Sequence, residues 1–390
     1  DGISGVFFAM AVLCCPYLVI LYILYGTFVW CRRKNKNTAA FLTPKRFLFF
    51  SAGVLLPAVC FTAEVLLRIR PEQYGMILRG LFSDPRHSGS LGEKAAELWT
   101  TVTERPYVFA FAGATIAGVC IKKPKVRCML DGLVLVLTVY SVYASREYIN
   151  FLMFPLNLTG LYFYTVYRRQ SMKDVFWGVW FPGAVYGLCI HLSSNQVFYA
   201  VSSAMTVSMV ASVMIAVETL RELRFEARTV LANYVLPGLL AAALVLLGAI
   251  EIDLRWNFVF WDKDISQQTR LLVEGPQKGL MVTPERQEEY GARADTMAHV
   301  EDEAALLVLA PDTYLYLFGN RTNSSYSAWL GRQEEATLPR LRLYYALNPE
   351  KWPDQVIATE KWPETAVYFE ECGYVETYRT ADGTRVLEKP

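Results

Sequence analysis

The sequence has almost no net charge, and this argues against nucleic acid as a binding partner. Lysine and arginine number 38 against 37 aspartates and glutamates, which leaves a formal net charge of +1. Proteins that bind nucleic acid neutralise phosphates with an excess of basic side chains. We therefore expect no nucleic-acid partner.

Motifs for metals, disulfides and cofactors are also missing. There is no C-x-x-C pair, and His87, His191 and His299 lie far apart in the sequence, so we predict no metal site. Cys372 is the only cysteine after residue 261, which excludes an internal disulfide there, and the others lie in or beside apolar runs. The segment 275–279 matches neither phosphate-binding loop motif. We predict no cofactor.

Long apolar runs dominate the first two thirds of the chain. Hydrophobic residues make up 53% of the sequence and charged residues 19%, against about 25% charged in an average soluble domain. A helix that crosses a bilayer needs roughly 20 apolar residues. About eight such spans fit, and we predict them at 5–30, 46–69, 107–121, 128–145, 148–167, 173–192, 197–219 and 229–252.

Basic residues fall in every second gap between these runs, as they do in cytoplasmic loops. They are Arg32, Arg33, Lys34, Lys36, Lys45 and Arg46, then Lys122, Lys123, Lys125 and Arg127, then Arg168, Arg169 and Lys173, and finally Arg221, Arg224 and Arg228. This alternation of basic and non-basic gaps predicts a multi-pass protein of the cell membrane whose C-terminal region lies outside the cytoplasm. It also predicts that Asp1 lies outside, and hence that a further membrane segment precedes it.

Residues 262–390 have ordinary globular composition, and we divide the chain into a transmembrane domain (1–261) and an extracytoplasmic α/β domain (262–390). The expected fold class is an all-α membrane bundle followed by a small α/β domain. Alternating strands and helices predict a mainly parallel sheet with a terminal hairpin around Ala381–Gly383. The predicted elements are strands at 271–273, 304–309, 355–359, 374–379 and 384–388, and helices at 285–299 and 336–347.

Polar residues at the predicted outer ends of the spans are the candidate substrate-binding groups, because ionisable side chains near a membrane bundle are costly to keep. They are Glu64, Arg68, Arg86, Arg146, Glu147, His191, Asn195, Gln196 and Arg255. Each has a structural alternative. Glu64 and Arg68 can form an i, i+4 pair, Arg146 can reach the headgroups instead of holding a phosphate, and the turn at 193–196 can close a tight membrane hairpin instead of binding a sugar.

Three segments of the C-terminal region carry a resemblance to a known class of proteins. They are Glu274–Leu280, Ser325–Trp329 and Tyr344–Pro353. Together with the bundle and its external loops, they resemble the GT-C superfamily of membrane glycosyltransferases, whose members share architecture more than motifs.

The resemblance implies transfer of a sugar from a polyprenyl-phosphate donor to an extracytoplasmic acceptor. It implies that Arg86, Arg146 or Arg255 holds the lipid phosphate and that the loop 70–106, with helices around 71–82 and 91–104, caps the donor site. The catalytic acid of such enzymes lies in the first external loop, to which only Asp1 could belong here, so no catalytic residue is assigned. Two alternatives stay open: a transporter or lipid flippase, and a non-catalytic assembly protein of the cell envelope.

Overall fold

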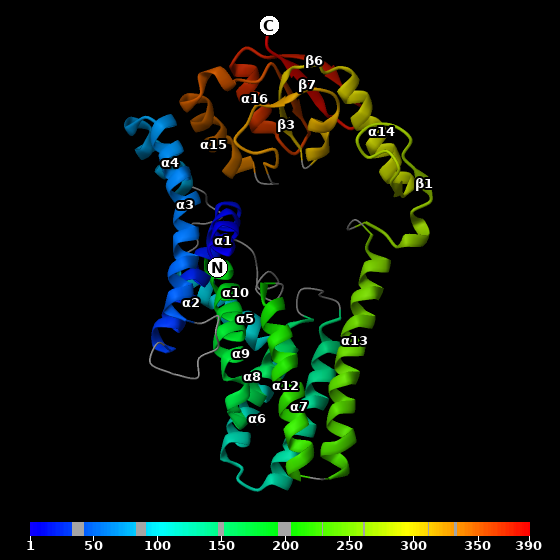
Figure 1. Ribbon diagram of the computed structural model, residues 1–390. Helices are drawn as coiled ribbons and strands as arrows, with labels where there is room; N and C mark the ends of the chain where they lie inside the picture. Colours follow the sequence, from blue (N-terminus) through cyan, green and yellow to red (C-terminus); the bar gives the residue numbers. More distant parts are fainter. Residues whose placement is uncertain are drawn as a thin grey trace. The chain divides into compact units, whose positions relative to one another are not determined.

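The computed structural model describes residues 1–32, 43–82, 91–146, 152–193, 204–227, 229–259, 262–310, 312–330 and 334–390 (Figure 1). Contacts divide the chain into two compact units. The first comprises Asp1–Ile69 and Gly89–Leu254, and the second comprises Arg70–Ser88 and Arg255–Pro390.

The first unit is helical. Its elements are α1 (Gly2–Cys14), η1 (Pro16–Leu18), α2 (Val19–Arg32), α3 (Pro44–Arg68), α5 (Leu91–Thr103), α6 (Pro106–Cys120), α7 (Pro124–Ala144), α8 (Phe154–Tyr167), η4 (Gln170–Met172), α9 (Lys173–Val175), η5 (Phe176–Trp180), α10 (Phe181–Ser193), α12 (Thr206–Ala227), η6 (Leu231–Val235) and α13 (Leu236–Asn257), whose last residues belong to the second unit.

Four stretches of helix among the described residues are long and apolar enough to cross a membrane. They are Pro44–Arg68, Pro124–Ala144, Gln170–Leu192 and Leu231–Asn257. They match the predicted spans 46–69, 128–145, 173–192 and 229–252, so the membrane character of this unit is confirmed. The helices α6 and α8 have only 15 and 14 residues, and α12 begins later than the predicted span 197–219.

The predicted single span 5–30 is wrong, because the chain breaks at Cys15 and turns back. Pro16 has no N–H to continue α1 and disfavours helical dihedrals at the residue before it, and Cys15 takes φ −138° and ψ 86°. The rings of Phe8 and Tyr22 lie 6.4 Å apart, whereas 14 residues of straight helix would separate them by about 21 Å.

The start of the chain therefore does not lie across a bilayer from Arg46. The Asp1 carboxylate lies 3.7 Å from Nε of Arg46, in the first turn of α3. The prediction that Asp1 faces the outside assumed one straight crossing between Gly5 and Trp30, and that assumption fails.

Close helix contacts and buried hydroxyls hold the centre of the first unit together. A Cβ added at Gly160 of α8 would lie 2.3 Å from Ser212 of α12, so glycine lets these two helices touch. The Trp180 indole donates to Ser212 Oγ at 2.9 Å, and the Thr138 and Thr159 hydroxyls lie 2.7 Å apart. Buried polar groups need such partners because they are out of reach of water.

The second unit is an α/β domain with helices on both faces of a small sheet (Figure 1). Its elements are α4 (Pro71–Phe82), η7 (Ile265–Gln267), β1 (Arg270–Leu271), β2 (Met281–Val282), α14 (Pro284–Ala298), β3 (Ala305–Leu309), η8 (Thr313–Leu317), β4 (Thr322–Asn323), α15 (Glu334–Leu347), η9 (Pro349–Lys351), β5 (Gln355–Ala358), α16 (Pro363–Glu371), β6 (Val375–Arg379) and β7 (Arg385–Glu388). The helix α4, from the predicted loop 70–106, packs against α15.

The sheet has the order β4-β3-β5-β7-β6. Strands β3, β4 and β5 are parallel, while β7 runs antiparallel to both β5 and β6, so the predicted parallel sheet with a terminal hairpin is confirmed. Successive residues of β3 point to opposite faces. Leu307 packs with α15 and α16, and Leu306 packs with Met297 of α14.

Candidate functional site

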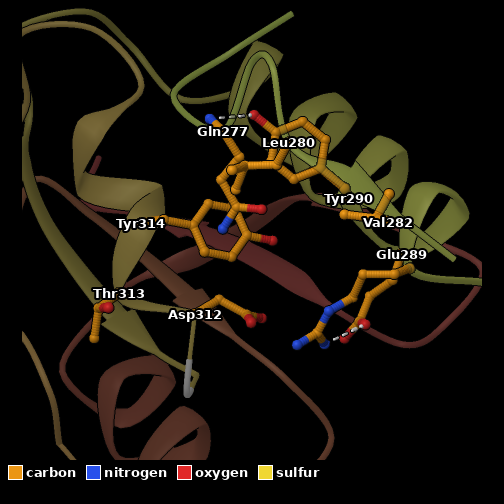
Figure 2. Close-up of a pocket in the computed structure, with 9 residues that line it drawn as sticks. Gln277, Leu280, Val282, Glu289, Tyr290, Asp312, Thr313 and Tyr314 are labelled. Carbon is orange, nitrogen blue, oxygen red and sulfur yellow. Dashed lines mark hydrogen bonds and ion pairs between the residues drawn. The ribbon is translucent and has the colours of Figure 1, made fainter. Parts of the chain in front are cut away.

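A pocket opens in the second unit beside α14, at the carboxyl end of β3. It is lined by Gln277, Leu280, Val282, Arg286, Glu289, Tyr290, Asp312, Thr313 and Tyr314. Figure 2 shows the side chains from α14 facing those from the segment after β3. Ligands of open α/β sheets bind beyond the carboxyl ends of the strands, because the connecting loops there leave side chains and backbone groups free.

One wall of the pocket is the loop between β1 and β2. Gly275 and Gly279 both have positive φ, at 73° and 92°, which residues with a Cβ rarely adopt. A Cβ at Gly275 would also lie 2.1 Å from the Tyr290 hydroxyl. That hydroxyl donates to the Glu274 carbonyl at 3.1 Å. It accepts from the Gln277 amide at 3.3 Å (Figure 2). Tyr290 therefore fixes the loop against α14.

The helix α14 contributes three side chains to the pocket lining, along one of its faces. Thr283 caps the helix by accepting from the Arg286 amide at 3.2 Å, which sets where it begins. Arg286, Glu289 and Tyr290 then follow at spacings of three and four residues and point the same way. The Arg286 guanidinium pairs with Glu289 at 3.0 Å, and the two side chains are 47% and 46% exposed, so both can also reach a ligand.

The other wall comes from the segment after β3. Its Tyr314 ring stacks on the Tyr290 ring with centroids 5.6 Å apart. Burial and then the nearby Asp312 carboxylate raise the pKa of Tyr314. Its hydroxyl can donate a hydrogen bond. The pocket thus combines two aromatic rings with an acidic group.

Arg293, one helical turn after Tyr290, links the segments that form the base of the pocket. Its buried guanidinium contacts Asp312 at 3.0 Å, Asp382 at 2.9 Å and the Thr384 hydroxyl at 2.6 Å. Burial acts to raise the pKa of Asp382, but hydrogen bonds from Thr380 and Thr384 and the charge of Arg293 outweigh it and lower that pKa to about 2. The network ties α14, the end of β3 and the β6–β7 hairpin to one point.

The size and lining of the pocket suit a small polar molecule. Its volume is about 220 Å³, which is below the range of roughly 300–1,000 Å³ found for pockets that enclose drug-sized ligands. The lining offers a cation, two carboxylates, an amide and hydroxyls beside two aromatic rings. This combination favours an uncharged ligand with many hydroxyls and exposed C–H faces.

Several of the residues that we predicted from the sequence to bind substrate fall in the described part of the chain. They lie in separate places. Glu64 and Arg68 pair with each other on α3 and are 53% and 79% exposed. The Arg146 guanidinium lies 4.3 Å from the centre of the Tyr143 ring. His191 is fully buried, with Nε2 at 3.1 Å from the Lys94 carbonyl oxygen of α5.

Glu64 pairs within α3, the Arg146 guanidinium donates to the Tyr143 carbonyl near the end of α7, and His191 contacts α5. Arg255, near the end of α13, belongs to the second unit. The remaining predictions, Arg86, Glu147, Asn195 and Gln196, fall on residues outside those that the structure describes.

The sequence reasoning missed a buried carboxylate in the first unit. Asp131 of α7 is fully buried and accepts hydrogen bonds from the Tyr162 hydroxyl at 2.8 Å and the Tyr167 hydroxyl at 2.5 Å, both on α8. A charged residue within the predicted span 128–145 was the available signal, since such a group in a membrane helix needs partners. The two hydrogen bonds tie α7 to α8.

The pocket beside α14 was missed as well. The available signal was Asp312 and Tyr314 directly after an apolar strand, where a ligand site is expected in a parallel sheet. In the part of the chain that the structure describes, no cluster of three or more His, Cys, Asp or Glu side chains could hold a metal ion. The chain matches no protein-family model, no curated protein and no solved structure.

Proposed function

We propose that this chain is a multi-pass membrane protein whose C-terminal unit recognises a carbohydrate outside the cytoplasm. The observation that carries the proposal is the pocket in which Tyr290 and Tyr314 stand beside Arg286, Glu289 and Asp312. A sugar ring has C–H faces that pack on aromatic rings and a rim of hydroxyls that bond to charged groups. The pocket supplies both kinds of contact within one small volume.

Two further features support the proposed insertion in a membrane and the proposed location of the C-terminal unit outside the cytoplasm. Four long apolar helices support insertion in a bilayer. Basic residues at 122–127 and 168–173, on either side of the α7–α8 pair, support a cytoplasmic face at that end of the unit. Counting the crossings from α7 to the end of α13 then favours a C-terminal unit outside the cytoplasm.

A narrower proposal is that the bound carbohydrate takes part in glycosyl transfer. It is supported by the resemblance to membrane glycosyltransferases, which implies a polyprenyl-phosphate donor and an acceptor held outside the cytoplasm. In this scheme the pocket beside α14 binds the acceptor. Binding without transfer would instead fit an assembly protein of the cell envelope.

The experiment is binding of the full chain, held in lipid nanodiscs, to an array of bacterial envelope glycans. Wild-type protein should bind a subset of glycans. Replacing Tyr314 with leucine removes one stacked ring and should weaken binding about tenfold. Arg286→Gln removes a charged hydrogen-bond donor and should weaken it to a similar extent.

Arg342→Gln is the matched control, because Arg342 is also exposed in this unit but lies over the Tyr368 ring and away from the pocket. It should bind like the wild type. The proposal is overturned if no glycan binds, or if the Arg286 and Arg342 variants behave alike. Incubation of the bound complex with a radiolabelled polyprenyl-phosphate sugar then tests transfer separately, since binding can persist when transfer fails.

A further inference from the structure

A continuous apolar groove runs along the first unit, between α2 and the helical segment from α9 to α10. It consists of two cavities of about 430 and 420 Å³. The two cavities share Phe28, Trp177 and Pro182, so they adjoin. Each falls within the range of roughly 300–1,000 Å³ that encloses organic ligands.

The walls of the groove are almost entirely hydrocarbon and aromatic. The first cavity is lined by Leu24, Thr27, Phe28, Cys31, Lys173, Trp177, Phe181 and Pro182. The second continues past Leu21, Tyr22 and Tyr25 to Gly183 and Tyr186 and carries no charged residue. Such a surface is unfavourable in water and favourable against an acyl or isoprenoid chain.

The local helix geometry opens this groove. Residues Phe176–Trp180 form a turn of π-helix, which is wider than an α-helix and is frequent at functional sites. Gly178 lies in this turn and lines the second cavity, where a Cβ would lie 3.4 Å from the Phe28 ring, in ordinary van der Waals contact. Trp177 is 39% exposed although it is large and apolar.

Among the residues that the structure describes, one cation, Lys173, lies in the groove lining, at one end. Lys173 begins α9, is partly buried, and has no ion pair within the described ranges of the chain. By contrast, the nearby Arg169 is neutralised by Glu222 and Glu226, each at 2.8 Å. An ammonium group beside an apolar channel complements a phosphate that carries a hydrocarbon tail.

The groove has the length that such a tail requires. From Lys173 to Tyr186 the chain advances 13 residues, which is about 20 Å of helix. This covers about two thirds of the roughly 30 Å hydrocarbon core of a bilayer. Lys173 also lies near the start of the apolar stretch Gln170–Leu192, where a membrane helix meets the headgroups.

We propose that this groove binds a membrane lipid with an anionic phosphate headgroup, with one hydrocarbon chain along α2 and α10 and the phosphate at Lys173. The site lies in the first unit and is independent of the carbohydrate pocket. The charge of Lys173 selects the headgroup of the lipid, and the shape of the apolar walls selects its hydrocarbon chain.

The test compares retention of dioleoylphosphatidylglycerol and dioleoylphosphatidylcholine by the purified full chain, counted by native mass spectrometry. The wild type should retain the anionic lipid preferentially. Lys173→Gln should reduce that preference about fivefold, the effect of one lysine near a membrane surface. Lys123→Gln, which removes an exposed lysine that does not line the groove, should leave it unchanged.

A second pair of variants tests the channel. Leu21→Trp places a larger ring in the groove and should abolish retention, whereas Ile23→Trp, on the same helix but outside both linings, should not. Equal retention of both lipids by the wild type would overturn the headgroup assignment. Unchanged retention by Leu21→Trp would overturn the groove assignment.

Quenching of tryptophan fluorescence provides a second test, with milder substitutions, if these variants do not fold. Phosphatidylglycerol with brominated acyl chains, diluted to a few mole per cent in phosphatidylcholine, should quench tryptophan fluorescence more than brominated phosphatidylcholine at the same fraction. Trp177→Phe should remove that excess, and Trp30→Phe should keep it, because Trp30 does not line the groove. An excess that survives Trp177→Phe would contradict the proposal.

Discussion

Replacing Arg293 with methionine should destabilise the second unit by about 3–5 kcal/mol, because it leaves a buried carboxylate without its partner. The Arg293 and Asp312 side chains are only 9% and 14% exposed, so water screens their contact weakly. Asp382 is 45% exposed, and its pair with Arg293 is screened. Asp382→Asn should therefore cost only about 1 kcal/mol or less.

The double variant Arg293→Met with Asp312→Asn separates this explanation from a loss of packing. When both buried charges are gone, the penalty for an unpaired carboxylate disappears, and we expect most of the lost stability to return. If the loss came from packing alone, the double variant would be at least as unstable as Arg293→Met.

Hydrogen exchange of the full chain in detergent micelles measures these effects locally. Peptides from β3, β5 and α14 report the free energy of opening of the second unit, and peptides from α7 and α8 provide an internal reference. The reasoning is refuted if Arg293→Met exchanges within about 1 kcal/mol of the wild type, or if Asp312→Asn fails to rescue it. Because the pKa of Asp382 is lowered from 3.8 to about 2, its own contribution is fully present above pH 3.8 and is lost as the pH falls through about 2.

Two further predictions concern the helix packing and the sidedness. Gly160→Ala forces a Cβ to within 2.3 Å of Ser212 and should lower the stability of the first unit by about 1–3 kcal/mol, whereas Gly238→Ala, with nothing within 4 Å, should be neutral in the same thermal unfolding assay. Equal effects of the two substitutions would contradict the packing argument. A membrane-impermeant maleimide should label exposed Cys372 in intact cells, and Cys372→Ser should lower the labelling by that share, since Cys14, Cys31, Cys60 and Cys120 are exposed as well. Labelling that requires lysed cells would place the second unit in the cytoplasm.

The elements of the second unit could be predicted because their signals are local. The run Ala304–Leu309 is apolar and ends before a proline, and it forms β3. The pair of strands around Ala381–Gly383 likewise forms β6 and β7. Each pattern lies within about ten residues of chain, so no knowledge of the tertiary structure is needed.

The sites could not be predicted because their residues come together only on folding. Tyr290 and Tyr314 belong to different elements, and only the packing of α14 beside the end of β3 stacks their rings. In the same way, Asp131 finds its tyrosine partners on another helix. The break at Cys15 was hidden for a different reason, since an apolar run with one proline has nearly the same mean hydropathy as an unbroken span.

The contact between α4 and α15 determines when the second unit can complete its folding during synthesis. About 250 residues lie between these two helices, and the helices of the first unit from α5 to α13 are among them. A ribosome completes α4 early and α15 only after those helices have been synthesised, and closing so long a loop is slow. The second unit therefore cannot finish folding during early synthesis, and a fragment starting at Arg255 would lack one of its helices.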